Sequence, residues 1–164
     1  RKMYSQNLRL FILGFFSFAF FCYFSDIASA ATIGASVSAA RVTEGGSFTL
    51  RVVVNTKEKF INNAEAVISF PEIGVSLSLS TGKSIFSLWV ENPSFSNTSG
   101  VISFNGGVVN PGFNGVGEVF SVTFKAKKTG TASFLISGAA IRENDGFGTN
   151  ILEGSGSTSI IVED

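Results

Sequence analysis

The sequence lacks most of the side chains that carry out catalysis. It contains no histidine, and its only cysteine, Cys22, lies inside an apolar N-terminal run. A Ser-His-Asp triad, a thiol nucleophile and an imidazole-bound metal are therefore excluded. Glycoside hydrolysis needs two carboxyl groups about 5 to 10 Å apart. The acids on predicted strands and loops lie in no recognisable site of that kind: Glu65, Glu72, Glu91 and Glu118. We predict that the chain is not an enzyme, with no catalytic residue and no cofactor.

One segment offers oxygen ligands for a metal ion. Residues 143–150 read Glu-Asn-Asp-Gly-Phe-Gly-Thr-Asn, with Asp145 before a glycine. A calcium loop of the EF-hand type requires dense Asp/Asn alternation and a closing glutamate, and the alternation is absent here. Asp145-Gly146 is equally typical of a tight turn between strands. We predict no metal site, with Asp145 as the weak alternative.

Two aromatic residues are candidates for stacking on sugar rings. Trp89 is the only tryptophan, and Phe113 lies between Gly112 and Asn114 in a predicted loop. If Phe86, Leu88 and Val90 face the core, period-two alternation makes Trp89 face solvent. The competing interpretation is that a single tryptophan in a phenylalanine-rich chain packs into the core.

These side chains must be positioned by strands, because period-two alternation runs through most of the sequence. Apolar residues alternate with polar ones over 47–54, 75–80, 120–126 and 132–137, and shorter pieces follow at 64–70, 101–104 and 158–162. Such alternation is typical of antiparallel sheets with one buried face. Glycine, asparagine and serine cluster between the runs, at 45–46, 106–107, 112–117 and 154–156. The pattern predicts one all-β domain, an antiparallel β-sandwich or jelly roll.

The first thirty residues are predicted to lie outside this domain as a signal peptide helix. Positive residues precede the apolar run 10–24, and Ala28-Ser29-Ala30 supplies the small residues of a cleavage site. Cleavage after Ala30 leaves nine basic and eleven acidic residues, a net charge of −2. We therefore predict a domain over 31–164 that is secreted or displayed at the cell surface. Its contact with a membrane is limited to export, and without a basic patch it has no nucleic-acid partner.

The order of these segments resembles the cohesin domain, the module of bacterial scaffold proteins that captures dockerin domains. The segments that carry the resemblance are 33–37, 48–54, 61–71, 84–89, 92–97, 100–104, 117–126, 129–132 and 144–150. The resemblance as a whole covers essentially all of residues 32–163. The resemblance implies a nine-stranded jelly roll, related in fold to some carbohydrate-binding modules, without enzymatic activity. It also implies a partner, a dockerin domain that docks on one sheet of the cohesin. Dockerins fold around calcium, so such docking would depend on calcium.

The resemblance places two segments, 64–70 and 132–137, in the dockerin-binding sheet. With Ala64, Ala66, Ile68 and Phe70 inward, alternation directs Glu65, Val67 and Ser69 outward, and it does the same for Ser133, Leu135 and Ser137. Val67 and Leu135 then form an apolar centre with a polar rim, as interfaces usually have. The predicted protein-binding residues are Asn62, Asn63, Glu65, Val67, Ser69, Ser133 and Leu135. The alternative is that isolated outward apolar residues have no function.

Three functions remain open at this point. The first is a cohesin-like module that docks an extracellular dockerin-type protein for scaffold assembly or surface attachment, including in polysaccharide degradation. The second is a carbohydrate-binding module whose partner is a polysaccharide. The third is a passive spacer in a larger surface protein.

Overall fold

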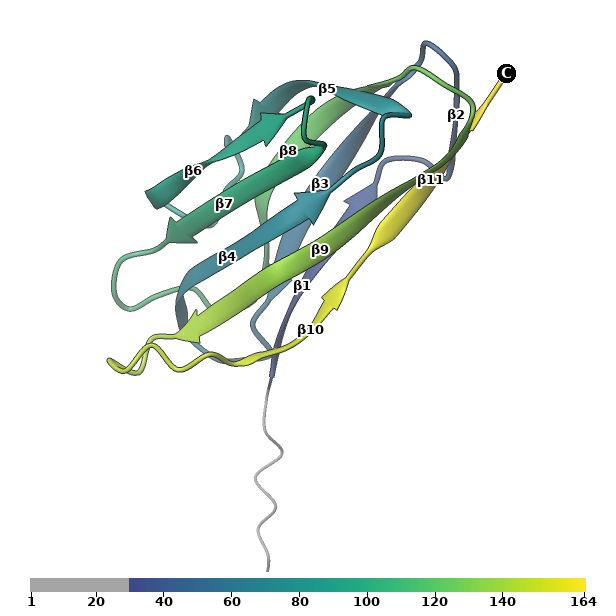
Figure 1. The fold of residues 1–164 in the computed structure, drawn as a ribbon. Helices are drawn as coiled ribbons and strands as arrows, with labels where there is room; N and C mark the ends of the chain where they lie inside the picture. Colours follow the sequence, from purple (N-terminus) through teal and green to yellow (C-terminus); the bar gives the residue numbers. More distant parts are fainter. Residues whose placement is uncertain (1–29) are drawn as a thin grey trace, which may run out of the picture.

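The computed structural model describes residues 30–164, and these form a sandwich of two β-sheets without helices (Figure 1). The predicted signal peptide, 1–30, lies almost entirely outside the described residues. No helix in the described part is long and apolar enough to cross a membrane. The strands are β1 (Ala31–Val37), β2 (Arg41–Thr43), β3 (Ser47–Asn55), β4 (Ile61–Ser69), β5 (Gly74–Ser80), β6 (Leu88–Ser96), β7 (Val101–Gly107), β8 (Val116–Ala126), β9 (Gly130–Glu143), β10 (Leu152–Gly156) and β11 (Thr158–Glu163).

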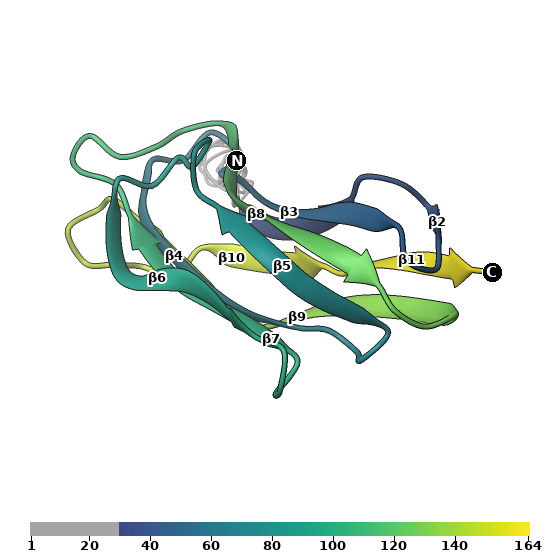
Figure 2. The same ribbon diagram turned by 90° about the horizontal axis from the view of Figure 1, so that it is seen from above.

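The two sheets have five and six strands, and they lie as two layers in Figure 2. The five-stranded sheet has the order β10-β1-β3-β8-β5, and the six-stranded sheet has the order β2-β11-β9-β4-β7-β6. The all-β sandwich predicted from the alternation is therefore confirmed. Within the second sheet, β4 lies between β7 and β9 and pairs with both of them in antiparallel register.

The structure has eleven strands rather than nine because the first and last stretches each change sheets. The chain leaves the five-stranded sheet after β1 and enters the six-stranded sheet as β2, and β10 and β11 are divided in the same way at Ser157. The two stretches run side by side, since β1 pairs with β10 and β2 pairs with β11. These two pairings are parallel, so the sandwich is antiparallel except at these places.

The core between the sheets is built from the predicted inward residues. On β3, β4 and β8 the alternating apolar side chains are almost fully buried, and so is Phe70, which follows β4 directly. Each of these side chains is 8% exposed or less: Phe48, Leu50, Val52, Val54, Ala64, Ala66, Ile68, Phe70, Phe120, Val122, Phe124 and Ala126. Aromatic rings dominate this core. Phe124 stacks on Phe48 with a centroid distance of 5.4 Å and meets Phe134 edge-on at 5.2 Å. Offset and edge-to-face contacts of this kind stabilise beyond their buried area.

Alternation fails on the edge strand β5. The pattern predicts that Leu77 is on the buried face, but Leu77 is 52% exposed. The pairing of β5 with β8 shifts register between Ser76 and Ser78. A bulge of this kind changes the face that the following residue occupies, and an edge strand has only one neighbour to hold its register.

Candidate functional site

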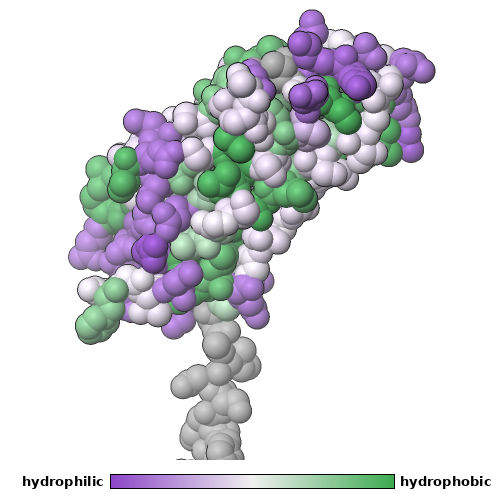
Figure 3. Space-filling model, viewed as in Figure 1, coloured by the Kyte–Doolittle hydropathy of each residue, from purple (hydrophilic) through white to green (hydrophobic). Residues whose placement is uncertain are grey.

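The predicted binding residues on β4 and β9 lie on the outer face of the six-stranded sheet. Ser69 is the register partner of Leu135, and Val67 is the partner of Ser137, so the two strands bring the residues together. Leu135 is 54% exposed and Val67 is 37% exposed. We call Val67 and Leu135 the apolar centre, and Ser69 and Ser133 are its nearest polar neighbours on the two strands. Figure 3 shows hydrophobic surface near the middle of this face, with hydrophilic surface towards both ends.

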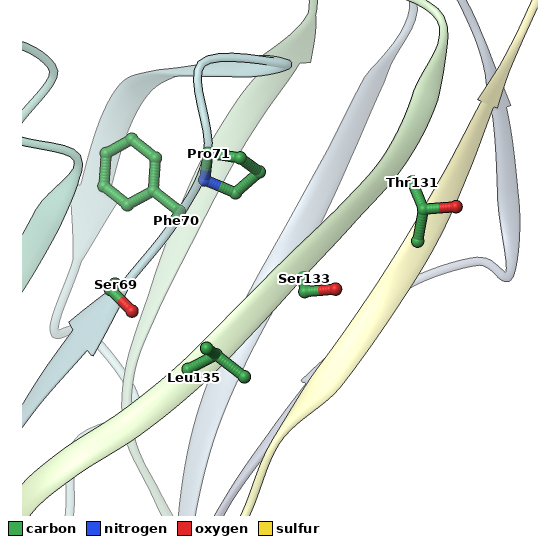
Figure 4. A pocket seen from close by; sticks show the side chains of 6 residues that line it. All are labelled: Ser69, Phe70, Pro71, Thr131, Ser133 and Leu135. Atoms are coloured by element: carbon green, nitrogen blue, oxygen red, sulfur yellow. The ribbon is translucent and has the colours of Figure 1, made fainter.

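A shallow depression of about 370 Å³ adjoins the apolar centre. Figure 4 shows the six side chains that line it: Ser69, Phe70, Pro71, Thr131, Ser133 and Leu135. Three of them are predicted binding residues. Phe70, Pro71 and Thr131 were not predicted, because Phe70 counts as a core residue by alternation and Pro71 follows the strand. The depression is open, and Phe70, Pro71 and Leu135 give it apolar walls, so it fits one apolar side chain of a partner better than an enclosed ligand.

A polar network occupies the next part of the same face. Arg142 Nη2 donates to Glu65 Oε1 at 2.7 Å, and Asn105 Nδ2 donates to Glu65 Oε2 at 3.0 Å. Asn63 Nδ2 in turn donates to Asn105 Oδ1 at 2.7 Å. Ser103 donates its hydroxyl hydrogen to Glu91 on the edge strand β6. The network fixes the Glu65 carboxylate between three strands, β9, β4 and β7.

Sequence reasoning found Asn63 and Glu65 in this network but missed their partners Asn105 and Arg142. The register places Asn105 opposite Glu65 on β7, and Arg142 is the β9 partner of Asn63. The only signal in the sequence was that Asn105 and Arg142 fall on the polar side of alternating segments. Alternation predicts which face of a strand a residue occupies, but it does not reveal which strands are neighbours. Arg142 neutralises Glu65, whereas Glu91 accepts from an uncharged hydroxyl. This part of the face is therefore polar and weakly negative.

The structure separates Asn62 from the other predicted residues. The pairing of β4 with β9 shifts register between Ile61 and Asn63. Two neighbouring asparagines can therefore contribute to different clusters. The Nδ2 of Asn62 donates to Asn144 Oδ1 at 3.4 Å, in the loop that follows β9.

The two predicted stacking residues are both half-buried. Trp89 packs edge-on against Phe86 with a centroid distance of 6.0 Å. Its ring covers Gly106, where an added Cβ would lie 2.6 Å from the tryptophan ring, so only glycine permits this packing. Phe86 is buried, but Leu88 and Val90 are 55% and 82% exposed while Trp89 turns towards the core, as in the competing interpretation that the tryptophan packs. Phe113 also packs against the core, and its backbone pairs with Ile61 through two hydrogen bonds. Sugar stacking at either ring stays a prediction.

Asp145 organises a turn. Its Oδ1 accepts hydrogen bonds from the backbone N–H groups of Phe147 at 2.8 Å and Gly148 at 2.9 Å, and Thr149 donates its hydroxyl hydrogen to Oδ2. The Thr149 hydroxyl and then the Phe147 N–H favour the charged carboxylate and lower the pKa of Asp145 to about 2. Within residues 30–164, no three acidic side chains gather into a group that could hold a metal ion.

Comparisons with known proteins identify the architecture. No protein-family model matches the chain, and no curated protein matches its sequence. Solved structures do match. A non-cellulosomal cohesin from the archaeon Archaeoglobus fulgidus aligns with a TM-score of 0.66 and 15% identity, over 82% of this chain and 92% of that one.

Two bacterial cohesins give the same picture. The sixth cohesin of scaffoldin B from Acetivibrio cellulolyticus, solved in complex with a dockerin, aligns with a TM-score of 0.63 and 14% identity, over 82% of this chain and 99% of that one. The cohesin module of a family 33 glycoside hydrolase from Clostridium perfringens aligns with a TM-score of 0.62 and 11% identity, over 82% and 98%. The part of the chain that the structure describes therefore has the fold of a cohesin module.

Proposed function

We propose that this chain is an exported, non-catalytic binding module that captures a dockerin-type domain through the outer face of its six-stranded sheet. The observation that carries the proposal is the apolar centre. It exposes Val67 and Leu135 beside an open depression, and a polar network lies next to it on the same face. An apolar centre with a polar surround is the usual anatomy of a protein interface.

The face has an open depression rather than an enclosed cavity beside the apolar centre, which favours a folded partner over a small ligand. Its residues stand on paired strands, so their spacing is fixed by the sheet before a partner arrives. Preorganisation of this kind reduces the entropy cost of association. The structures of cohesins solved with dockerins support a partner of that class. Scaffold assembly, surface attachment and a part in polysaccharide degradation are the roles that such a capture would serve.

A capture experiment tests the proposal. Residues 30–164, which contain all eleven strands and the whole core cluster, serve as bait for dockerin domains from the source organism, with calcium or with a chelator. We expect capture only with calcium. Leu135→Asp should weaken it at least about 30-fold, as a hot-spot loss of about 2 kcal/mol would.

The matched control is Ser36→Asp, which adds the same charge to the exposed outer face of the other sheet. It should leave capture unchanged. Normal capture by a folded Leu135→Asp variant would exclude this face as the binding site. Absence of capture in both calcium conditions would favour the third candidate, a spacer. A spacer role is compatible with the way the chain enters the sandwich at residue 30 and leaves it at the opposite end (Figures 1 and 2).

A further inference from the structure

A second surface with unexplained apolar exposure lies at one end of the sandwich. We define the loop end as the loops 56–60, 108–115 and 144–151, which lie together at the end where residue 30 enters (Figure 1). Phe147 there is 92% exposed, more than any other large hydrophobic side chain in the described chain, and Phe60 is 49% exposed. Neither residue contributes to the face formed by β4 and β9.

The turn that carries Phe147 is held in one conformation. The Asp145 carboxylate accepts the N–H groups of Phe147 and Gly148, which fixes the backbone on both sides of the ring. Gly146 has a φ of +80°, a left-handed conformation that glycine adopts without strain. An exposed aromatic ring on a fixed backbone loses little entropy when it binds, and this favours a role in recognition.

Hydrogen bonds tie the three loops into one unit. The backbone N–H of Asn144 donates to Phe60 O at 2.8 Å, which joins the two aromatic loops. The side chain of Asn144 donates to Asn110 Oδ1 at 2.9 Å and to Pro111 O at 2.8 Å. Asn114 Nδ2 donates to Glu58 O at 3.0 Å. Phe60 and Phe147 therefore belong to a single preformed surface.

The chemistry around the rings points to an uncharged, hydroxyl-rich ligand. The loop end carries the amides of Asn110, Asn114, Asn144 and Asn150 together with charges of both signs. Lys57 and Lys59 are balanced by Glu58 and Asp145, and Lys59 is paired with Glu143 at 3.3 Å. No basic cluster is present among the described residues of the loop end to attract anionic lipid or nucleic acid. An exposed ring on a loop surface that also carries several amides, without an excess of either charge, matches a neutral sugar, which offers an apolar ring face and hydroxyls around its edge.

From this arrangement we propose that the loop end binds neutral polysaccharide, with Phe147 stacking on a pyranose ring and Phe60 extending the contact. The site differs from the one expected from the sequence, since Trp89 and Phe113 are packed against the core while Phe147 is free of it. It does not depend on the proposed capture of a dockerin. A protein with both sites would hold a captured partner next to a polysaccharide.

Retention on insoluble polysaccharide tests the site. Residues 30–164 are mixed with cellulose, chitin or xylan, and the protein left in the supernatant is measured across a concentration series. We expect retention on at least one of these materials. Phe147→Ser should weaken it about tenfold, the scale expected for one buried aromatic side chain. Phe147→Trp should be retained about as well as the parent, because tryptophan keeps a flat aromatic surface at this position.

Leu77→Ser is the matched control, since it removes an exposed apolar side chain from β5 and should leave retention unchanged. Dockerin capture by Phe147→Ser should also be unchanged, which separates this proposal from the previous one. The proposal is overturned if none of these polysaccharides retains the protein, or if Phe147→Ser is retained as well as the parent. Binding to phosphatidylcholine vesicles without polysaccharide retention would likewise overturn it, in favour of a lipid surface.

Discussion

The outer faces of the two sheets have the same strand geometry but different surfaces. On the five-stranded sheet, the register aligns a row across four strands, Ser36, Arg51, Ser121 and Ser80. On the six-stranded sheet, the corresponding central positions include Val67 and Leu135. Both faces meet solvent in the isolated domain, so solvation alone does not account for the difference. The five-stranded sheet also exposes apolar side chains, but Leu77 lies on its edge strand β5 and Val116 at the start of β8, whereas Val67 and Leu135 lie on the adjacent middle strands β4 and β9. A face that keeps apolar side chains in water at its centre is the better candidate for a binding surface.

The polar contacts of the two faces differ as well. On the five-stranded sheet, Arg51 and Glu118 form one ion pair at 3.6 Å. On the six-stranded sheet, Glu65 accepts from both Arg142 and Asn105 at 3.0 Å or less. The first face is hydrated with weak internal contacts, whereas the second is internally ordered. Order of this kind lowers the entropy cost of binding a partner.

Glycine substitution should give the largest difference in stability between the two sheets. In Gly106→Ala, the new Cβ meets the Trp89 and Phe86 rings at 2.6 Å, and we expect a loss of about 1–3 kcal/mol from overpacking. Gly34→Ala in β1 meets nothing within 4 Å, so it should change stability by less than about 1 kcal/mol. Urea unfolding of both variants measures the contrast. Equal losses would show that the rings move aside at little cost.

Neutralising one carboxylate on each face should give a smaller difference. Glu65→Gln weakens two short contacts, and we expect a cost of up to about 1 kcal/mol. Glu118→Gln weakens one longer, partly exposed pair and should cost less than about 0.5 kcal/mol. The urea midpoints of the two variants and the parent, measured at low and high salt, give both stability losses. A larger effect at Glu118 would contradict the view that the six-stranded face is the more ordered one.

The smallest effect is expected at the loop end, outside both faces. The folded pKa of Asp145, about 2, lies below the usual 3.8, so its charged form stabilises the turn above pH 3.8. That contribution is lost as the pH falls through 2. Asp145→Asn should therefore unfold more easily than the parent at pH 7, with the difference shrinking near pH 2. NMR titration of the Asp145 carboxyl group measures its pKa directly, and a midpoint near 3.8 would contradict the hydrogen bonding described here.

Alternation predicted the core well where strands are central and regular. On β3, β4 and β8, every second side chain is apolar, and burying that side is the only arrangement that removes them from water. It failed at Leu77, where a register shift changes the face of a residue without leaving a sign in composition. Alternation left two interpretations of Trp89 open, and the structure supports the one in which the ring packs against the core. Its inward orientation requires the bare backbone of Gly106 on a different strand, at a separation of seventeen residues.

The candidate site was predictable in its strands but not in its partners. Val67 and Leu135 followed from parity, given that the two segments lie in one sheet. The juxtaposition of Leu135 with Ser69 and Pro71 around a depression, and the contacts of Glu65 with Arg142 and Asn105, depend on which strands are neighbours. Neighbour relations are set by long-range pairing, and a single sequence does not encode them locally.

The sequence by itself determined that residues 31–164 form an all-β sandwich and contain no histidine or cysteine, because periodicity and composition are local properties. Only the tertiary structure decided which apolar side chains remain exposed. It packed Trp89 and Phe113 against the core and left Phe147 in solvent, although all three are aromatic residues. The physical reason is that exposure depends on what the rest of the chain places beside a ring. For Trp89 that neighbour is Phe86 over the open backbone of Gly106, and for Phe147 it is a turn closed by the Asp145 carboxylate.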